Sequence, residues 1–285
     1  MAGEAALPGA EPAAPVDDSA AVGLPPGPLL ELAAGDLALE LAPQAGGRIA
    51  QLRHRDAELL VGYGGANTHP IAWGCYPMLP WAGRIRGGRF GFGEREYRLP
   101  VEADGHAVHG VGHVMPWRVD RHAATLAELS LELPADARWP FGGVARQRIE
   151  LAPDRLRMQL SVSAGVLAMP AALGWHPWFR KPERLEFSPV AMYPRDAEGI
   201  ATAPPVAPGP GPWDDCFLNR EPAILELQGR TLRLSSDCAH WVIYDAAAHA
   251  TCVEPQTGPP DAFNLMPQRL APGASLEAWF LIELR

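Results

Sequence analysis

The chain has 285 residues and a formal net charge of −9, with 24 lysines and arginines against 33 aspartates and glutamates. Nucleic-acid binding needs a basic face, so this acidic balance predicts no nucleic-acid partner. No run of 18 apolar residues occurs, which argues against a membrane span. A hydrophobic share of 47% is ordinary for a globular protein with a sizeable core.

The N-terminal stretch is rich in alanine, proline and glycine and has few large apolar side chains. Such a segment buries too little surface to offset its loss of conformational entropy. We therefore expect a disordered tail over residues 1–28 and a single domain over residues 29–285. The stretch also lacks the basic and apolar regions of a secretory signal.

The four cysteines are widely scattered and form no Cys-x-x-Cys pair. Their spacing matches neither a zinc site nor a small disulfide framework, so a reducing compartment is the simpler interpretation. Together with the missing signal, this predicts a cytoplasmic protein. The cysteines are Cys75, Cys216, Cys238 and Cys252.

Alternation of apolar and polar residues with a period of two recurs along the chain and predicts β-strands. It appears in residues 36–42, 126–133, 155–162, 231–235 and 276–284. Clusters of glycine, proline and aspartate separate these runs at short intervals, and no long stretch has a clean helical period. The pattern predicts an all-β fold, a large antiparallel β-sandwich.

Arg84 is the first candidate site residue. It lies in a segment from Tyr76 to Gly93 that is rich in glycine, proline and aromatic residues. A guanidinium offers a rigid fork of donors that suits sugar hydroxyl groups. The plainer interpretation is a surface arginine beside a Gly-Gly turn.

Three histidines follow at positions i, i+3 and i+7: His106, His109 and His113. On a helix this spacing would suggest a metal site, since histidine is the commonest metal ligand. The glycines at positions 105, 110 and 112 and Pro116 make a helix unfavourable here. We therefore expect no metal at these histidines.

A further histidine and an acidic pair come next. His176 lies in Gly-Trp-His-Pro-Trp-Phe, where the proline and tryptophans would fix and partly bury the imidazole. A packed core histidine is the alternative interpretation. In Trp-Asp-Asp-Cys-Phe, Asp214 or Asp215 offers an acceptor-only carboxylate that can hold a pair of hydroxyl groups. A simple turn after Pro212 would also explain this stretch.

Glu254 ends the β-prone run 250–253 and is followed at once by Pro255. Proline removes a backbone donor, so we expect the strand to stop here and hold Glu254 beside a stiff loop. A solvated glutamate before a turn is the alternative.

The segment from Val253 to Asn264 resembles the C-terminal signature of the aldose 1-epimerases, or mutarotases, in which Glu is followed by Pro-Asp-Ala and Asn. The Arg84 segment resembles their Asn-Arg-Ile stretch, with Gly83 where Asn is common. His109 matches their first histidine, His176 their His-Pro motif and Asp214 their Asp-x-x-Phe element. The matches span residues 74–264 in the order of the family.

The resemblance implies a β-supersandwich of the galactose mutarotase-like type and the interconversion of the α and β anomers of a free aldohexose such as galactose or glucose. Glu254 would be the base on the C1 hydroxyl, and His176 the acid on the ring oxygen. His109 would join them in catalysis, and Arg84 and Asp214 would bind the sugar. The expected assembly is a monomer or homodimer that acts without a cofactor.

Two alternatives stay open at this stage. The substrate is another sugar or a hexose 6-phosphate, for which Arg84, Arg86 and Arg89 are available. Alternatively, the chain is a noncatalytic sugar-binding module, since a fold does not fix a function.

Overall fold

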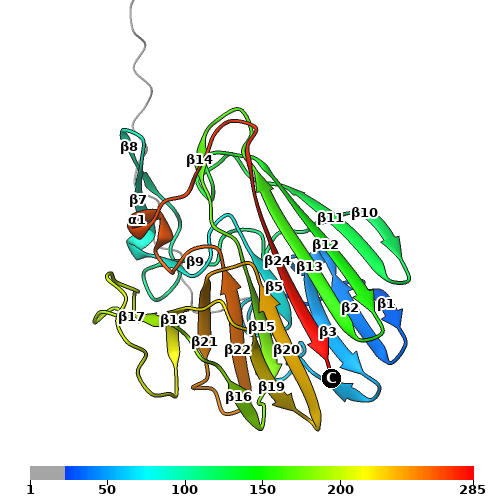
Figure 1. The fold of residues 1–285 in the computed structure, drawn as a ribbon. Coiled ribbons are helices and arrows are strands. Elements are labelled where there is room, and N and C mark those ends of the chain that lie inside the picture. Colours follow the sequence, from blue (N-terminus) through cyan, green and yellow to red (C-terminus); the bar gives the residue numbers. More distant parts are fainter. Residues whose placement is uncertain (1–22) are drawn as a thin grey trace, which may run out of the picture.

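The computed structural model describes residues 23–285. It consists of two large antiparallel sheets that pack face to face (Figure 1). The predicted tail lies largely outside the described residues. Among the described residues, Leu24 already contacts the sandwich, because its backbone N–H donates to the carbonyl oxygen of Thr68 at 3.0 Å. This contact precedes the predicted boundary at Pro28.

The first sheet has 10 strands in the spatial order β1-β2-β3-β5-β15-β22-β21-β18-β17, with β4 paired to β3. Its strands are β1 (Leu30–Ala34), β2 (Leu37–Ala42), β3 (Arg48–His54), β4 (Ala57–Glu58), β5 (Cys75–Met78), β15 (Gly174–Arg180), β17 (Ala191–Tyr193), β18 (Asp214–Leu218), β21 (His240–Tyr244) and β22 (Ala250–Gln256).

The second sheet has 8 strands in the order β10-β11-β12-β13-β24-β20-β19-β16. They are β10 (Arg118–Ala123), β11 (Leu126–Glu132), β12 (Val144–Ala152), β13 (Arg155–Ser163), β16 (Arg184–Glu186), β19 (Ala223–Leu227), β20 (Arg230–Ser236) and β24 (Ser275–Leu284). All five alternating runs of the sequence are strands, so the all-β prediction is confirmed.

Short elements decorate one end of the sandwich, where α1, β7, β8 and β9 lie near one another (Figure 1). Three two-stranded sheets pair β6 (Arg84–Ile85) with β9 (Ala107–Val108), β7 (Arg89–Phe92) with β8 (Arg95–Arg98), and β14 (Met169–Pro170) with β23 (Arg269–Leu270). The short helices are α1 (Ala262–Leu265) and the 3₁₀ turns Pro43–Ala45 and Arg86–Gly88. None of the helices in residues 23–285 is long and apolar enough to cross a membrane.

The main core fills the space between the two sheets. Strand alternation sends Trp175, Phe179 and Val253 of the 10-stranded sheet into this core, together with Phe280 of the other sheet. The opposite face of the central strands is buried as well, and every residue of β22 is buried. A strand buried on both faces must be covered by loops, and that covered face carries the candidate site.

Candidate active site

His176 and Glu254 lie on neighbouring central strands. The register of β15 and β22 pairs Gly174 with Gln256 and Trp178 with Cys252, which places His176 opposite Glu254 when it is continued between them. Directly opposed residues in an antiparallel pair share one face and have close side chains. The distance from His176 Nε2 to Glu254 Oε1 is 3.3 Å.

Pro255 does not end its strand, so the sequence-based prediction of a strand stop was wrong. β22 continues through Pro255 to Gln256, and Pro255 lies opposite Trp241 of β21. Proline does remove a ladder donor. Pro255 in β22 and Pro177 in β15 both lie in the stretch where no residue pairs join the two strands. The ladder is therefore interrupted at the point where His176 faces Glu254.

His109 reaches the same place from a loop with an unusual backbone. It adopts the left-handed conformation (φ 57°), which is uncommon for a residue other than glycine. Its N–H donates to Gly83 O at 2.9 Å. The next residue must be glycine, because a Cβ on Gly110 would lie 1.9 Å from Leu79 O. The strained loop presents His109 edge-on to His176, with ring centroids 5.1 Å apart.

Aromatic rings pack around the histidines. The ring of Tyr76 stacks on that of His176 with a centroid distance of 4.7 Å. The ring of Trp178 also stacks on His176, with a centroid distance of 5.5 Å. Tyr76 also contacts His109 and His113 at 5.8 and 5.5 Å. The sequence indicated aromatic cover for His176, but the contacts of Tyr76 and His113 depend on the fold and were missed.

Arg48 packs against this aromatic cluster. Its side chain is fully buried, and no carboxylate within residues 23–285 pairs with it. It donates instead to the carbonyl oxygens of Ala45, Pro70, Trp73 and His113 at 2.6–3.1 Å. Its guanidinium also lies over the rings of Trp73 and Tyr76. Burial lowers the pKa of Arg48 to about 10, so it stays charged at neutral pH. Arg48 therefore fixes the loop that carries His113.

Burial favours the neutral forms of both central groups. It lowers the pKa of His176 to about 3, with a further contribution from His113. It raises the pKa of Glu254 well above its ordinary value, and the negative charge of Asp214 adds to this effect. These two directions favour a neutral His176 beside a protonated Glu254. In this form the pair holds one proton, which burial favours on Glu254.

Arg84 is placed by residues of the C-terminal signature. Asp261 donates its N–H to Arg84 O at 2.6 Å, and its Oδ1 accepts the N–H of Arg86 at 3.0 Å. Arg84 Nε in turn donates to Asp104 Oδ2 at 2.8 Å. Gly83 has a φ of 68°, a left-handed conformation that asparagine also tolerates. The Pro-Asp-Ala segment therefore holds the Arg84 loop against the site.

Asp214 and Asp215 share one arginine. Arg195 Nη1 lies 2.6 Å from Asp214 Oδ2, and Arg195 Nε lies 3.3 Å from Asp215 Oδ1. Both carboxylates line the site, so either one can contact a bound molecule. Arg195 had no sequence signal, because it lies in a stretch between β17 and β18 that matches none of the motifs above.

A cavity of ≈ 350 Å³ brings the five predicted residues together. It lies on the covered face of the 10-stranded sheet. Its lining includes Arg84, His109, His176, Asp214 and Glu254, with Trp178, Arg195, Tyr244 and Gln256 among their neighbours. Gln256 Nε2 donates to Glu254 Oε2 at 3.3 Å. The arrangement offers two proton-transfer groups at one point and polar groups around them.

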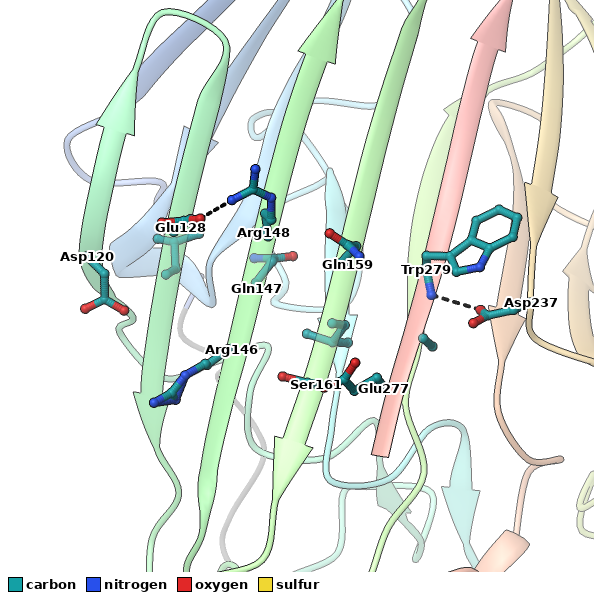
Figure 2. A pocket seen from close by; sticks show the side chains of 13 residues that line it. Asp120, Glu128, Arg146, Gln147, Arg148, Gln159, Ser161, Asp237, Glu277 and Trp279 are labelled. Carbon is teal, nitrogen blue, oxygen red and sulfur yellow. Dashed lines mark hydrogen bonds and ion pairs between the residues drawn. The ribbon is translucent and has the colours of Figure 1, made fainter. Parts of the chain in front are cut away.

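A larger cavity of ≈ 490 Å³ lies elsewhere, over β11, β12, β13 and β24 (Figure 2). Most of its charged side chains come from outward-facing positions of the 8-stranded sheet, and Asp237 comes from the segment after β20. Arg148 pairs there with Glu128, and Asp237 accepts the N–H of Trp279 at 2.8 Å. None of the five predicted residues lines this cavity, and its ionisable groups are partly or fully exposed. It lacks a buried pair like His176 and Glu254 of the smaller cavity.

The three histidines of the 106–113 segment do not converge. His106 Nδ1 accepts the N–H of Gly87 at 3.1 Å. The ring centroids of His109 and His113 are 6.3 Å apart. The geometry therefore gives no support to a metal bound by this trio.

The family model for aldose 1-epimerases matches residues 28–283. The chain belongs to the aldose 1-epimerase family. The uncharacterised proteins YphB and YihR of Escherichia coli K12 are 33% and 27% identical to it over 155 and 156 residues. These alignments cover 52% and 53% of this chain, which spans about half (50%) of the length of each relative.

Solved structures of this family share the fold. A galactose mutarotase-like protein from Clostridium acetobutylicum superposes with a TM-score of 0.81 at 18% identity, covering 90% of this chain and 95% of its own. A galactose 1-epimerase from Lactobacillus acidophilus NCFM gives 0.76 at 14% identity, covering 90% and 94%. The predicted galactose mutarotase-like supersandwich is thereby confirmed.

Proposed function

We propose that this epimerase-family protein is a mutarotase that interconverts the α and β anomers of a free aldohexose. The observation that carries the proposal is the buried pair of His176 and Glu254. Their Nε2 and Oε1 atoms are 3.3 Å apart in the cavity that Arg84, His109 and Asp214 also line. Such strongly perturbed titratable groups in a cavity are typical of catalytic sites.

The reaction needs a base that removes the C1 hydroxyl proton and an acid that protonates the ring oxygen. Glu254 is the proposed base and His176 the proposed acid. Because Glu254 holds the shared proton, the pair first moves it across 3.3 Å to His176. Hydrogen bonds from sugar hydroxyls to the carboxylate favour its ionised form and so promote this transfer.

After ring opening, rotation about the C1–C2 bond presents the other face of the aldehyde. Closure reverses both proton transfers and leaves Glu254 ionised and His176 protonated. The proton then passes from His176 back to Glu254, which restores the resting pair. His109, edge-on to His176, steadies the oxygen that gains the proton. Arg84 and the Asp214–Arg195 pair supply donors and acceptors for the remaining hydroxyls. A volume of ≈ 350 Å³ lies within the usual range for a small-molecule site.

The charges around the cavity favour a neutral sugar over a phosphorylated one. Its basic lining residues, Arg84 and Arg195, are already paired with carboxylates. Arg86 pairs with Asp196 and Glu198, and it does not line the cavity. A phosphate would therefore have to break an ion pair and lie near Glu254.

A noncatalytic binding module is the weaker alternative. Burying a carboxyl group and an imidazole costs stability, because neither can keep its hydration. A site that only holds a sugar does not require that cost. Proton transfer does require such a pair.

Polarimetry tests the proposal. Freshly dissolved α-anomers of galactose, glucose, other aldoses and hexose 6-phosphates are followed with and without the protein. We expect faster mutarotation of at least one neutral aldohexose. Acceleration confined to phosphorylated sugars would contradict the argument from charge, and no acceleration for any sugar would contradict the proposed activity.

A further inference from the structure

A cysteine lies beside the proposed acid–base pair. Cys252 is on the same strand as Glu254, two residues away and on the same face. One donor atom from each of His176, Cys252 and Glu254 lies within 4.8 Å of the other two. Among residues 23–285, this is the one group of three or more His, Cys, Asp and Glu side chains close enough to hold a metal ion.

We propose that His176, Cys252 and Glu254 form a binding site for a thiophilic divalent cation such as zinc, and that a cation bound there inhibits the protein. The binding itself is independent of the proposed function. The inhibition rests on it, because the cation would occupy both proton-transfer groups.

The distance between two of the donors already suits a metal. A tetrahedral zinc ion with nitrogen and oxygen ligands at about 2.0–2.1 Å holds those two atoms about 3.3–3.4 Å apart. The distance from His176 Nε2 to Glu254 Oε1 is 3.3 Å. Bringing the Cys252 sulfur to about 2.3 Å from the ion requires a movement on the order of 1 Å.

The donor set is typical of zinc. Imidazole, thiolate and carboxylate are its usual ligands, while magnesium and calcium prefer oxygen alone. The fourth position would face the cavity, which His176 and Glu254 line. His176 Nδ1 is buried without a hydrogen-bond partner, so the ring can adjust without losing one.

Charge also favours a dication. Cys252 is fully buried and Glu254 is 2% exposed, so ionising either group alone is costly. A zinc ion displaces the thiol proton and the carboxyl proton, and the resulting set of one dication and two anionic ligands is neutral. Asp214, whose negative charge acts on both groups, adds to the attraction for a cation. The positive charges of Arg48 and Arg84 act on His176 and weaken this attraction for a cation.

The test uses the full-length protein, freed of metals by a chelator and then titrated with Co²⁺, a coloured substitute for zinc. We expect a thiolate-to-cobalt charge-transfer band that saturates at one ion per chain and is displaced by Zn²⁺. Cys252→Ser keeps the side-chain volume and should abolish the band. Cys216→Ala is the matched control, because Cys216 lines the same cavity but is not in the group; it should keep the band.

No band with the wild-type protein, or a band that survives Cys252→Ser, would overturn the metal site whatever the enzyme activity. Thermal melting of each variant shows whether it is folded, and Cys252→Ala serves as a second variant if serine is not tolerated. Zn²⁺ should inhibit mutarotation by the wild-type protein. The Cys252→Ser variant should need a Zn²⁺ concentration at least about 100-fold higher for the same inhibition, because losing even an outer-shell partner of a metal lowers its affinity 10–100-fold. Equal inhibition of both would refute the role of Cys252.

Discussion

Replacing His113 with asparagine should change how the stability of the protein depends on pH. His109, His113 and His176 are buried, and burial lowers the pKa of all three. In the unfolded chain each histidine binds a proton near pH 6.5. Below that pH the unfolded state therefore binds more protons, and the free energy of unfolding falls as the pH falls. Each histidine contributes about 1.4 kcal/mol per pH unit, or about 2 kcal/mol between pH 6.5 and 5.

Glu254 acts with the opposite sign. Its pKa is raised in the folded state, so its contribution to stability is lost as the pH rises above its unfolded value. This contribution is common to the wild-type protein and the variant, and it cancels in their difference. The cavity left by the smaller side chain lowers the stability of the variant equally at every pH, so it cancels when the difference at pH 5 is compared with the difference at pH 7.

Chemical denaturation at pH 5, 6 and 7 measures the effect. The variant should gain about 2 kcal/mol relative to the wild-type protein on going from pH 7 to pH 5, since it lacks one histidine that the unfolded state protonates. His122→Asn is the control, because His122 is exposed. If the stability curves of wild-type protein and His113→Asn ran parallel, burial would not be what keeps His113 neutral.

Three further outcomes follow from the site. Arg48→Met should lower the free energy of unfolding by about 3 kcal/mol or more, since it leaves several buried carbonyl groups without a donor; a loss below about 1 kcal/mol in denaturant unfolding would contradict this. Asp214→Asn should raise KM by roughly 10-fold or more and change kcat less, because a charged hydrogen-bond acceptor for the sugar is lost; steady-state kinetics with kcat alone reduced would contradict it. The pH profile of kcat/KM should show no acid limb between pH 5 and 7, because the pKa of His176 is lowered to about 3; a limb near pH 6.5 would mean that His176 titrates normally.

Much of the site could be predicted because it consists of local motifs. Arg84, His109, His176, Asp214 and Glu254 each have neighbours that mark them in the sequence, and the structure brings all five to one cavity. Their catalytic and binding roles stay a prediction until they are measured. The strands could be predicted equally well, because alternation of apolar and polar residues with a period of two follows directly from the geometry of a pleated sheet.

What could not be predicted depends on contacts between distant segments. Arg48 looks like any arginine in the sequence, and its buried set of four carbonyl partners exists only once β3 meets the loops around residues 70 and 113. Arg195 meets Asp214 in the same way. Pro255 misled the strand prediction because proline usually ends a central strand. Here the missing donor falls in a stretch where β15 and β22 are not paired.

The protonation of the central pair was also beyond the sequence. In solution, a glutamate is ionised and a histidine is protonated between about pH 4.3 and pH 6.5. The fold buries both, at 2% and 7% exposure, and burial favours the neutral forms. This reversal depends on the loops that cover the sheet, which no local pattern encodes.

The mutarotation rate of Glu254→Gln tests the central claim most directly. The variant keeps the shape of the side chain and removes the base, so kcat for the preferred aldohexose should fall by roughly 10²-fold or more in polarimetry. Sugar binding by calorimetry should persist, because Arg84 and Asp214 remain. His176→Asn should behave alike, and the double variant should lose less than the product of the two, since the residues act as a unit. A Glu254→Gln protein that turns over the sugar at nearly the wild-type rate would contradict the account.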